Sequence, residues 1–257
     1  MKTIFVIIVL FAASLQAQEE EKFLFVGNSF TFYWNLPSQV EKMGEQNQLL
    51  WNINQTTASG ASLRDHWQGN KNLQTKALLS ENFYDHVIFQ EQSSLPLQTI
   101  DTTVYYFNQL KNLLPDQTKV YFYATWMYPN ILPDSLNGKI ENSIEKILQN
   151  NIVAEDVQLV RVGKAFEMFS YEYPEIGLFS DDDKHPSAAG TYLAACVFYA
   201  TFSGQSSLGL ERRFQGKDEA GKSIYYSMVE KHVAEACQKI ADQVVFDENE
   251  ENIALIN

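Results

Sequence analysis

The segment Lys-Phe-Leu-Phe-Val-Gly-Asn-Ser-Phe-Thr, residues 22–31, contains the structural unit that the rest of the chain repeats. Lys22 to Val26 is a short apolar run, which is typical of a buried β-strand. Gly27 follows and permits a tight turn, and residues 36–46 then place Leu36, Val40 and Met43 on one helical face. A strand, a tight turn and a helix in this order are the unit from which parallel sheets are built.

The same alternation continues to the end of the body. It predicts further strands over residues 50–57, 85–92, 119–125 and 157–162, and helices over residues 104–114, 139–150, 188–202 and 223–245. Residues 204–221 are polar and contain glycine, so we expect a surface excursion there. Repeated strand–helix pairs imply an α/β fold with a five-stranded parallel sheet and helices on both faces.

The two ends of the chain differ in composition from the segment between them: the first is apolar and the last is acidic. Lys2, the apolar run 4–13 and the small residue Ala17 have the layout of a secretory signal peptide. A retained anchor helix is the alternative, but the run is shorter than the roughly 20 apolar residues that span a bilayer. We expect a signal peptide over 1–17, one domain over 18–246 and an acidic tail over 247–257. No cysteine follows the apolar run, so the sequence predicts a secreted or periplasmic protein without a lipid anchor.

The formal net charge of −13 limits the partners. An acidic protein is poorly suited to nucleic acid or to anionic membrane surfaces. The composition favours a neutral or weakly charged small molecule, or a carbohydrate, and no membrane insertion of the mature chain. It leaves the oligomeric state open. Cys196 and Cys237 lie among apolar residues, and we favour two buried free thiols over a disulfide.

Ser29 stands directly after the first strand, on the turn into the next helix. Ligands of open parallel sheets bind beyond the carboxyl ends of the strands. A serine there is exposed at the sheet edge, beside the free N–H groups of a helix N-terminus. The alternative is a serine that only caps the helix.

The segment from Asp182 to His185 supplies the partners that a nucleophilic serine needs. Such a serine needs a base, and the base needs an orienting carboxylate. An aspartate three residues before a histidine can turn back to the imidazole within one loop, and Pro186 stiffens the entry to the next helix. Taken alone, the segment could also be an acidic surface turn.

Together, the Gly27–Phe30 and Asp182–His185 segments resemble the SGNH/GDSL hydrolase family, whose first block is Gly-Asp-Ser-Leu or a variant and whose last block is Asp-x-x-His. The resemblance extends from Phe23 to about Phe202. The Gly-Asn-Ser-Phe-Thr form is similar to a secreted bacterial branch. It implies a three-layer α/β/α sandwich of flavodoxin-like strand order, with Ser29 as nucleophile, His185 as base and Asp182 as orienting acid.

The resemblance also implies an oxyanion hole, formed by the N–H groups of Ser29 and Gly60 and a third donor. The usual Gly-x-Asn-Asp of the third block is missing here, and residues 89–94 read Phe-Gln-Glu-Gln-Ser-Ser. A glutamine amide can replace the family's asparagine, and Gln90 or Gln92 could supply it. We favour Gln90 because it ends the apolar strand. Asn28 replaces the family's aspartate and is expected to brace the turn.

Trp126 and His66 are the candidate substrate-binding residues, because His66 follows the Gly60 segment and Trp126 follows the fourth predicted strand. Tryptophan can stack on a sugar ring, but aromatic residues at such positions are also common in cores. His66 could act as a rival base, yet it lacks a suitably spaced aspartate. The sequence shows no metal-binding motif and no phosphate-binding loop, so we expect neither a metal nor a cofactor.

These observations predict a serine esterase that removes acetyl or other short acyl groups from carbohydrate. The carbohydrate preference follows from family analogy and the aromatic residues near the site. Two alternatives stay open. The altered third block fits a non-catalytic carbohydrate-binding protein on the same fold, and a lipase or thioesterase would need an apolar acyl channel.

Overall fold

The computed structural model describes residues 19–128, 131, 143–153, 156–217 and 220–247. The expected signal peptide, all but the first residue of the expected acidic tail and the start of the helix predicted from residue 139 lie outside these ranges.

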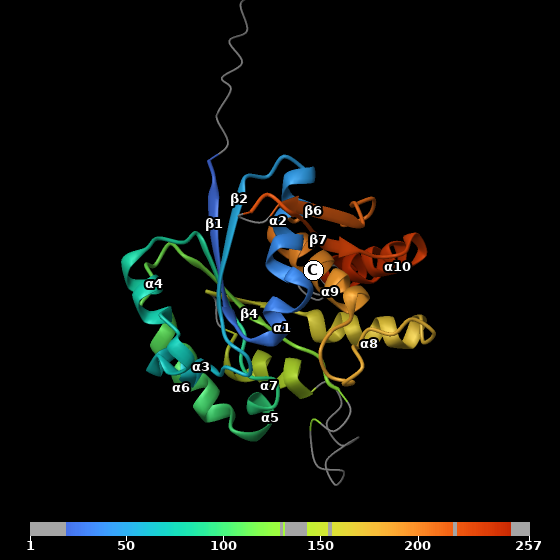
Figure 1. The fold of residues 1–257 in the computed structure, drawn as a ribbon. Coiled ribbons are helices and arrows are strands. Elements are labelled where there is room, and N and C mark those ends of the chain that lie inside the picture. The colour runs from blue at the N-terminus through green and yellow to red at the C-terminus, as the bar shows by residue number, and fades with distance from the viewer. Residues whose placement is uncertain (1–18, 129–130, 132–142, 154–155, 218–219, 248–257) are drawn as a thin grey trace, which may run out of the picture.

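A five-stranded sheet forms the centre of the molecule (Figure 1). Its strands are β1 (Glu21–Gly27), β2 (Trp51–Thr57), β3 (His86–Phe89), β4 (Lys119–Tyr123) and β5 (Val157–Val160). All neighbours pair in parallel, in the order β2-β1-β3-β4-β5. The predicted α/β class, strand number and flavodoxin-like order are therefore confirmed.

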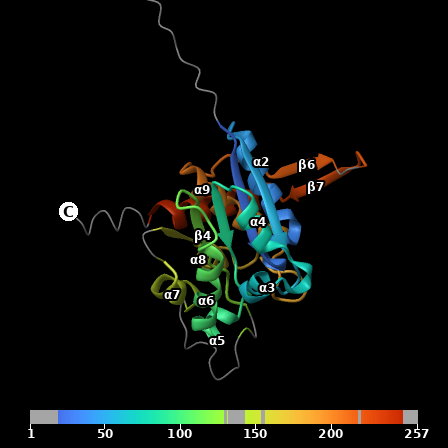
Figure 2. The same ribbon diagram turned by 90° about the vertical axis from the view of Figure 1, so that its left-hand side faces the viewer.

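Helices cover both faces of the sheet, which gives the three layers visible in Figure 2. One face carries α2 (Leu36–Gln46), α8 (Val162–Glu172), α9 (Ala188–Ser203) and α10 (Lys231–Asp242). The other face carries α3 (Leu63–Gln68), α4 (Thr75–Glu81), α6 (Ile100–Lys111) and α7 (Ser143–Asn151). Shorter helical turns are α1 (Ser29–Phe32), η1 (Tyr33–Asn35), η2 (Asn70–Asn72), α5 (Leu95–Gln98) and η3 (Gln243–Asp247).

The central strand β1 explains why two separate cores form. Phe23 and Phe25 point into the core beneath α2 and α9. Leu24 and Val26 point into the core on the opposite side, with residues of α3 and α6. Because neighbouring side chains of a strand face opposite ways, an unbroken apolar run fills both cores at once. The carboxyl end of β1, where Gly27 stands, is thus buried on both faces of the sheet.

The end of the chain differs from the sequence prediction. Residues 223–245 were expected to form one helix, but Ser223–Met228 is strand β7, paired antiparallel with β6 (Arg213–Lys217). Gly221 has a φ of 78°, a backbone conformation that suits glycine and a turn. The branched and aromatic residues after it favour an extended strand, and α10 begins only at Lys231.

Helix α8 was not predicted from the sequence. Val162, Ala165, Phe166 and Phe169 of α8 are buried at helical spacing.

Cys196 and Cys237 are both buried and form no disulfide, as expected. Within the described ranges, no helix is long and apolar enough to cross a membrane.

Candidate active site

The turn that carries Ser29 is held by the side chain of Asn28. The Asn28 Oδ1 atom accepts a hydrogen bond from the N–H of Phe30 at 3.1 Å and so caps α1. The Asn28 Nδ2 group donates to the carbonyl of Ala61 at 2.9 Å. This second bond ties the loop after β1 to the loop after β2. Asn28 thus braces the turn, as expected.

Gly27 is required because other atoms occupy the space of a side chain. A Cβ atom on Gly27 would lie 2.5 Å from Thr31 Oγ1 and 2.6 Å from Gln90 Oε1. Both distances are far below normal contact. A larger residue would therefore push apart the nucleophile turn and the end of β3.

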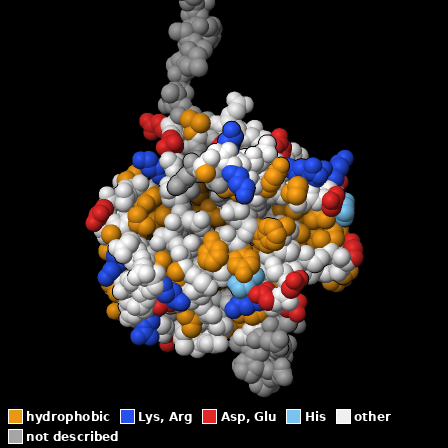
Figure 3. Space-filling view, viewed as in Figure 1, with side chains coloured by type: hydrophobic (Ala, Val, Ile, Leu, Met, Phe, Trp, Pro, Cys, Tyr) orange, Lys and Arg blue, Asp and Glu red, His pale blue; other side chains and the backbone are white. Residues whose placement is uncertain are grey.

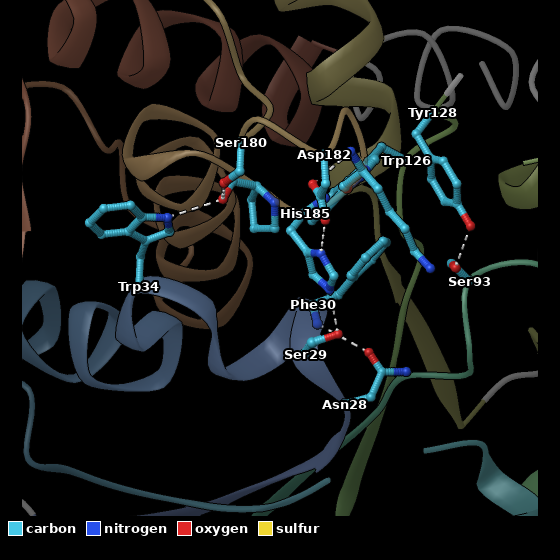
Figure 4. A network of polar contacts seen from close by, with 12 residues as sticks. Asn28, Ser29, Phe30, Trp34, Ser93, Trp126, Tyr128, Ser180, Asp182 and His185 are labelled. Atoms are coloured by element: carbon cyan, nitrogen blue, oxygen red, sulfur yellow. Dashed lines mark hydrogen bonds and ion pairs between the residues drawn. The ribbon is translucent and has the colours of Figure 1, made fainter. Parts of the chain in front are cut away.

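Ser29, His185 and Asp182 form a chain of hydrogen bonds (Figure 4). The Nε2 atom of His185 lies 2.8 Å from Ser29 Oγ, and its Nδ1 atom lies 2.5 Å from Asp182 Oδ2. The structure thus brings together residues 156 positions apart in sequence. The contact to His185 is made by Asp182, as the sequence prediction specified.

The loop that carries Asp182 and His185 is closed by backbone hydrogen bonds. The N–H of Ser180 donates to the carbonyl of His185 at 2.8 Å, and Phe179 bridges to Pro186. Asp182 Oδ1 accepts from the N–H groups of Lys184 at 3.1 Å and His185 at 2.9 Å. The carboxylate therefore holds both the loop and the imidazole.

These contacts keep Asp182 ionised. The hydrogen bond to the His185 ring, followed by the one from the His185 N–H, lowers the pKa of Asp182 to about 2. An ionised carboxylate at Nδ1 fixes the tautomer in which Nε2 can accept the Ser29 proton. In this arrangement His185 can act as a general base toward Ser29.

Trp126 supports the site from inside the protein, which corrects the expectation that it contacts substrate. Its side chain is 1% exposed and is stacked between Phe30 and Phe166. The indole N–H donates to the carbonyl of Lys184 at 3.1 Å. Trp126 therefore anchors the loop before His185 and presents no face to solvent.

His66 is also a supporting residue and not a substrate contact or a rival base. It is fully buried, with Nδ1 2.7 Å from Thr75 Oγ1 and Nε2 3.0 Å from the carbonyl of Gly27. The Gly27 carbonyl can only accept, so Nε2 carries the proton. Burial lowers the pKa of His66 to about 4, which keeps the ring neutral.

Gln90 is buried, and its amide is engaged through Oε1 and through one of the two hydrogens of Nε2. Its Oε1 atom accepts from the N–H of Asn28 at 2.8 Å and from Thr31 Oγ1 at 3.2 Å. Because the Asn28 N–H can only donate, this orientation of the amide is fixed. The Nε2 group donates to the carbonyl of Glu91. The second hydrogen of Nε2 has no acceptor among the described residues, so the role of Gln90 as third donor stays a prediction.

Gln92 is the better candidate for a third donor. Its Oε1 atom accepts from the N–H of Ser94 at 3.1 Å and from Ser94 Oγ at 3.0 Å. No described residue accepts a hydrogen bond from its Nε2 group. The side chain is half-buried in the loop that follows β3.

The two backbone donors expected for the oxyanion hole are not used by other hydrogen bonds among the described residues. No acceptor among the described residues takes the N–H of Ser29 or that of Gly60. Gly60 is exposed with a φ of 59°, in the left-handed region that glycine tolerates. The bond from Asn28 Nδ2 to Ala61 keeps its loop beside the serine.

Two aromatic residues at the site were missed by the sequence prediction. Tyr33 stacks on the His185 ring, with centroids 4.2 Å apart and planes 11° apart. Trp34 is exposed and donates its indole N–H to the carbonyl of Pro186 at 3.1 Å. The aromatic run Phe30 to Trp34, directly after the nucleophile, was the available signal.

A buried carboxylate, Glu91, lies behind the site. Its Oε1 atom accepts from the N–H groups of Leu63 at 3.0 Å and Gln92 at 2.7 Å, and its Oε2 atom accepts from Thr103 Oγ1 at 3.2 Å. Burial raises the pKa of Glu91 to about 7. No set of three His, Cys, Asp or Glu side chains within the described ranges is arranged to hold a metal ion.

A large hollow in the surface lies away from this chemistry. It measures about 940 Å³ and is lined mainly by residues beside β4 and β5, including Lys119 and Tyr121. It contains none of Ser29, Asp182 and His185. The hydrogen-bonded chain, and not cavity size, identifies the candidate active site.

The chain is similar in structure to several solved proteins. No protein-family model and no curated protein matches its sequence. A DUF4886 family protein from Bacteroides uniformis matches with a TM-score of 0.68 and 15% identity, over 90% of this chain and 96% of that chain. A candidate SGNH hydrolase from Slackia heliotrinireducens matches with a TM-score of 0.59 and 22% identity, over 72% and 100%.

A candidate GDSL-like lipase from Parabacteroides merdae matches with a TM-score of 0.52 and 16% identity, over 73% of this chain and 97% of that chain. At these identities the likeness shows the fold. The α/β sandwich described above is that of SGNH/GDSL hydrolase-like proteins.

Proposed function

We propose that this protein is a secreted serine esterase that removes acetyl or other short acyl groups from carbohydrate. The observation that carries the proposal is the chain from Ser29 Oγ through His185 to Asp182, with contacts of 2.8 and 2.5 Å. A serine, a histidine of fixed tautomer and an ionised aspartate in this order are the arrangement that activates a hydroxyl for acyl transfer.

In the proposed reaction, His185 Nε2 takes the proton of Ser29 while Oγ bonds to the ester carbonyl carbon. The N–H groups of Ser29 and Gly60 stabilise the resulting oxyanion, and Gln92 is the candidate third donor. The bond between the former carbonyl carbon and the alcohol oxygen of the ester then breaks, and His185 gives the proton to that oxygen. Water, activated by the same histidine, releases the acyl group and restores Ser29.

The likeness to proteins named as SGNH hydrolase and GDSL-like lipase supports an ester-acting hydrolase. Tyr33 and Trp34 beside His185 favour a carbohydrate substrate over a free fatty ester. A carbohydrate-binding protein without catalysis remains the second candidate. The observation that favours it is the engagement of Gln90 by Asn28, Thr31 and Glu91, which leaves only one Nε2 hydrogen for an oxyanion.

A fluorophosphonate probe separates the two candidates. The probe should label the wild-type protein at Ser29, and neither Ser29→Ala nor His185→Ala should be labelled. Ser80→Ala, at an exposed serine on α4, is the matched control and should be labelled fully. Absence of labelling in a folded wild-type protein would favour the binding protein.

Activity on p-nitrophenyl esters of increasing chain length tests the acyl preference. The proposal expects the highest kcat/KM on acetate, and a maximum on long chains would indicate a lipase or thioesterase. Secretion is tested separately, because cleavage of the signal peptide after Ala17 would leave Gln18 as the N-terminal residue of the exported protein.

A further inference from the structure

The segment η1, which follows the nucleophile helix, has an unusual backbone. Trp34 and Asn35 have φ values of 48° and 56°, although neither is glycine. Side chains disfavour this left-handed region, and such residues persist where surrounding contacts hold them, often at functional sites. The conformation makes the chain turn sharply after Tyr33, so that Trp34 lies beside the loop that carries His185.

Hydrogen bonds fix Trp34 at both its backbone and its ring. The buried side chain of Gln39 donates to the Trp34 carbonyl at 2.7 Å. The indole N–H donates to the Pro186 carbonyl at 3.1 Å, and Ser180 Oγ donates to the same carbonyl at 2.9 Å. Because Pro186 follows His185, the indole has a fixed position relative to the candidate base (Figure 4).

The fixed indole is nevertheless 51% exposed. Tyr33, its neighbour in the chain, is partly exposed and is stacked on the imidazole of His185. In the space-filling view, hydrophobic side chains gather beside a histidine near the middle of the visible face (Figure 3). Tyr33 and Trp34 both contact the loop that carries His185, Tyr33 through the imidazole and Trp34 through the carbonyl of Pro186.

We propose that Trp34 is a sugar-binding platform for a ring next to the acylated one, so that the enzyme acts on acylated oligosaccharides and not on single acylated sugars. The geometry that carries this is an exposed indole that is fixed to the His185 loop and is next in the chain to Tyr33, which stacks on His185. The inference rests on the proposed esterase function and specifies its substrate.

The chemistry of the platform favours a sugar ring over an acyl chain. An acyl chain gains stability in proportion to the apolar area it buries, so it needs an enclosing channel. A pyranose has a flat face of C–H groups that matches an aromatic ring and keeps its hydroxyls in water. The indole N–H is already bonded to Pro186, so the ring offers its apolar face alone. An open, flat and rigid surface of this kind suits a sugar.

The experiment compares kcat/KM on an O-acetylated disaccharide and on the O-acetylated monosaccharide of the same sugar. The wild-type enzyme should prefer the disaccharide, and Trp34→Ala should lower this preference about tenfold, as expected for loss of one aromatic contact. Trp34→Phe, which keeps an aromatic face but loses the N–H bond to Pro186, should retain most of it. Tyr171→Ala, at an exposed aromatic on α8, is the matched control and should leave the preference unchanged.

Binding without turnover provides a second measurement. In a Ser29→Ala background, calorimetry should show that Trp34→Ala weakens binding of the unacylated disaccharide by a similar factor. If the wild-type enzyme has no disaccharide preference, or if Trp34→Ala leaves it intact, the platform assignment is overturned. The same holds if Trp34→Ala instead reduces a preference for long acyl chains. Failure of the esterase function would appear separately, as absence of fluorophosphonate labelling and ester hydrolysis in the wild type.

Discussion

Ser29, Asp182 and His185 could be assigned from the sequence because each assignment rests on local spacing. An aspartate three residues before a histidine can meet its ring within one loop, whatever the rest of the fold does. Gln90 and Gln92 could not be separated in this way, because both lie on the same face of the same segment. Which amide is free depends on Asn28 and Thr31, which come from a distant part of the chain.

Gln90 and Gln92 should therefore respond differently to alanine. Gln90→Ala leaves the buried N–H of Asn28 without its acceptor, which costs about 1–3 kcal/mol of stability. Gln92→Ala removes a candidate oxyanion donor, and it should lower kcat by about 10²-fold with little change in KM. Melting temperature and p-nitrophenyl acetate kinetics on both variants measure this. Normal turnover in both variants would mean that only backbone N–H groups hold the oxyanion.

Asp182→Asn should lower kcat by less than the roughly 10⁴-fold loss typical of a buried triad aspartate, and by less than Ser29→Ala or His185→Ala. The amide group introduced by this substitution would donate to Nδ1 and so favour the tautomer with a proton on Nε2, which cannot accept from Ser29. The loss stays moderate because the Asp182 carboxylate is half exposed and water can partly replace it. Steady-state kinetics measure it. Asp183→Asn is the control, since Asn tolerates the left-handed backbone at that residue and should keep full activity.

At the scale of elements, the strands were predicted more reliably than the final helix. The strand β1 is a short continuous apolar run with a glycine at its end, and a run of this length and composition is typical of a buried strand. The segment 223–245 instead contains two different periodicities, with an alternating strand before Val229 and a helical stripe after it. What stabilises Ser223–Met228 as a strand is its pairing with β6, and a contact between two segments cannot be recognised from the residues of either segment alone.

Glu91 connects three elements at the catalytic edge, and its removal should destabilise all of them. Glu91→Ala leaves the N–H groups of Leu63 and Gln92 without their acceptor and should cost about 2–4 kcal/mol. Glu91→Gln should cost much less near pH 7, because its Oε1 can accept both bonds and its Nε2 can donate to Thr103. Denaturant unfolding at pH 7 measures both variants. Equal losses in the two would show that the charge, and not the acceptor geometry, stabilises this junction.

At the scale of the whole molecule, the topology brings the site together. Loops after β1, β2 and β3 carry Ser29, Gly60 and Gln92, and parallel neighbours end at the same edge of the sheet. This rule made the edge predictable from the sequence. The rule does not predict which side chains at that edge are exposed and which are buried. For that reason Trp126 and His66 were expected to contact substrate, although both are buried.

Two buried groups, His66 and Glu91, should make opposite contributions to the pH dependence of stability, and these contributions should cancel each other in one window. The pKa of His66 falls from 6.5 to about 4 on folding, so its contribution is present above pH 6.5 and is lost as the pH falls toward 4. The pKa of Glu91 rises from 4.5 to about 7, so its contribution is present below pH 4.5 and is lost as the pH rises toward 7. Between pH 4.5 and 6.5 the unfolded chain holds one proton on His66 and the folded chain holds one on Glu91, and the two slopes cancel.

Single variants should expose each slope. In Glu91→Gln the slope of His66 is no longer offset by that of Glu91, so relative to the wild type the free energy of unfolding should rise by about 3 kcal/mol more between pH 4 and 6.5. In His66→Gln the slope of Glu91 is no longer offset by that of His66, so relative to the wild type the free energy of unfolding should fall by about 3 kcal/mol more between pH 4.5 and 7. Urea unfolding across this range, with the wild type as reference, measures both slopes, and their opposite signs do not depend on the constant cost of either substitution. Single variants with the same pH dependence as the wild type would show that neither group changes its protonation on folding, and that His66 and Glu91 hold the catalytic edge by hydrogen bonds alone.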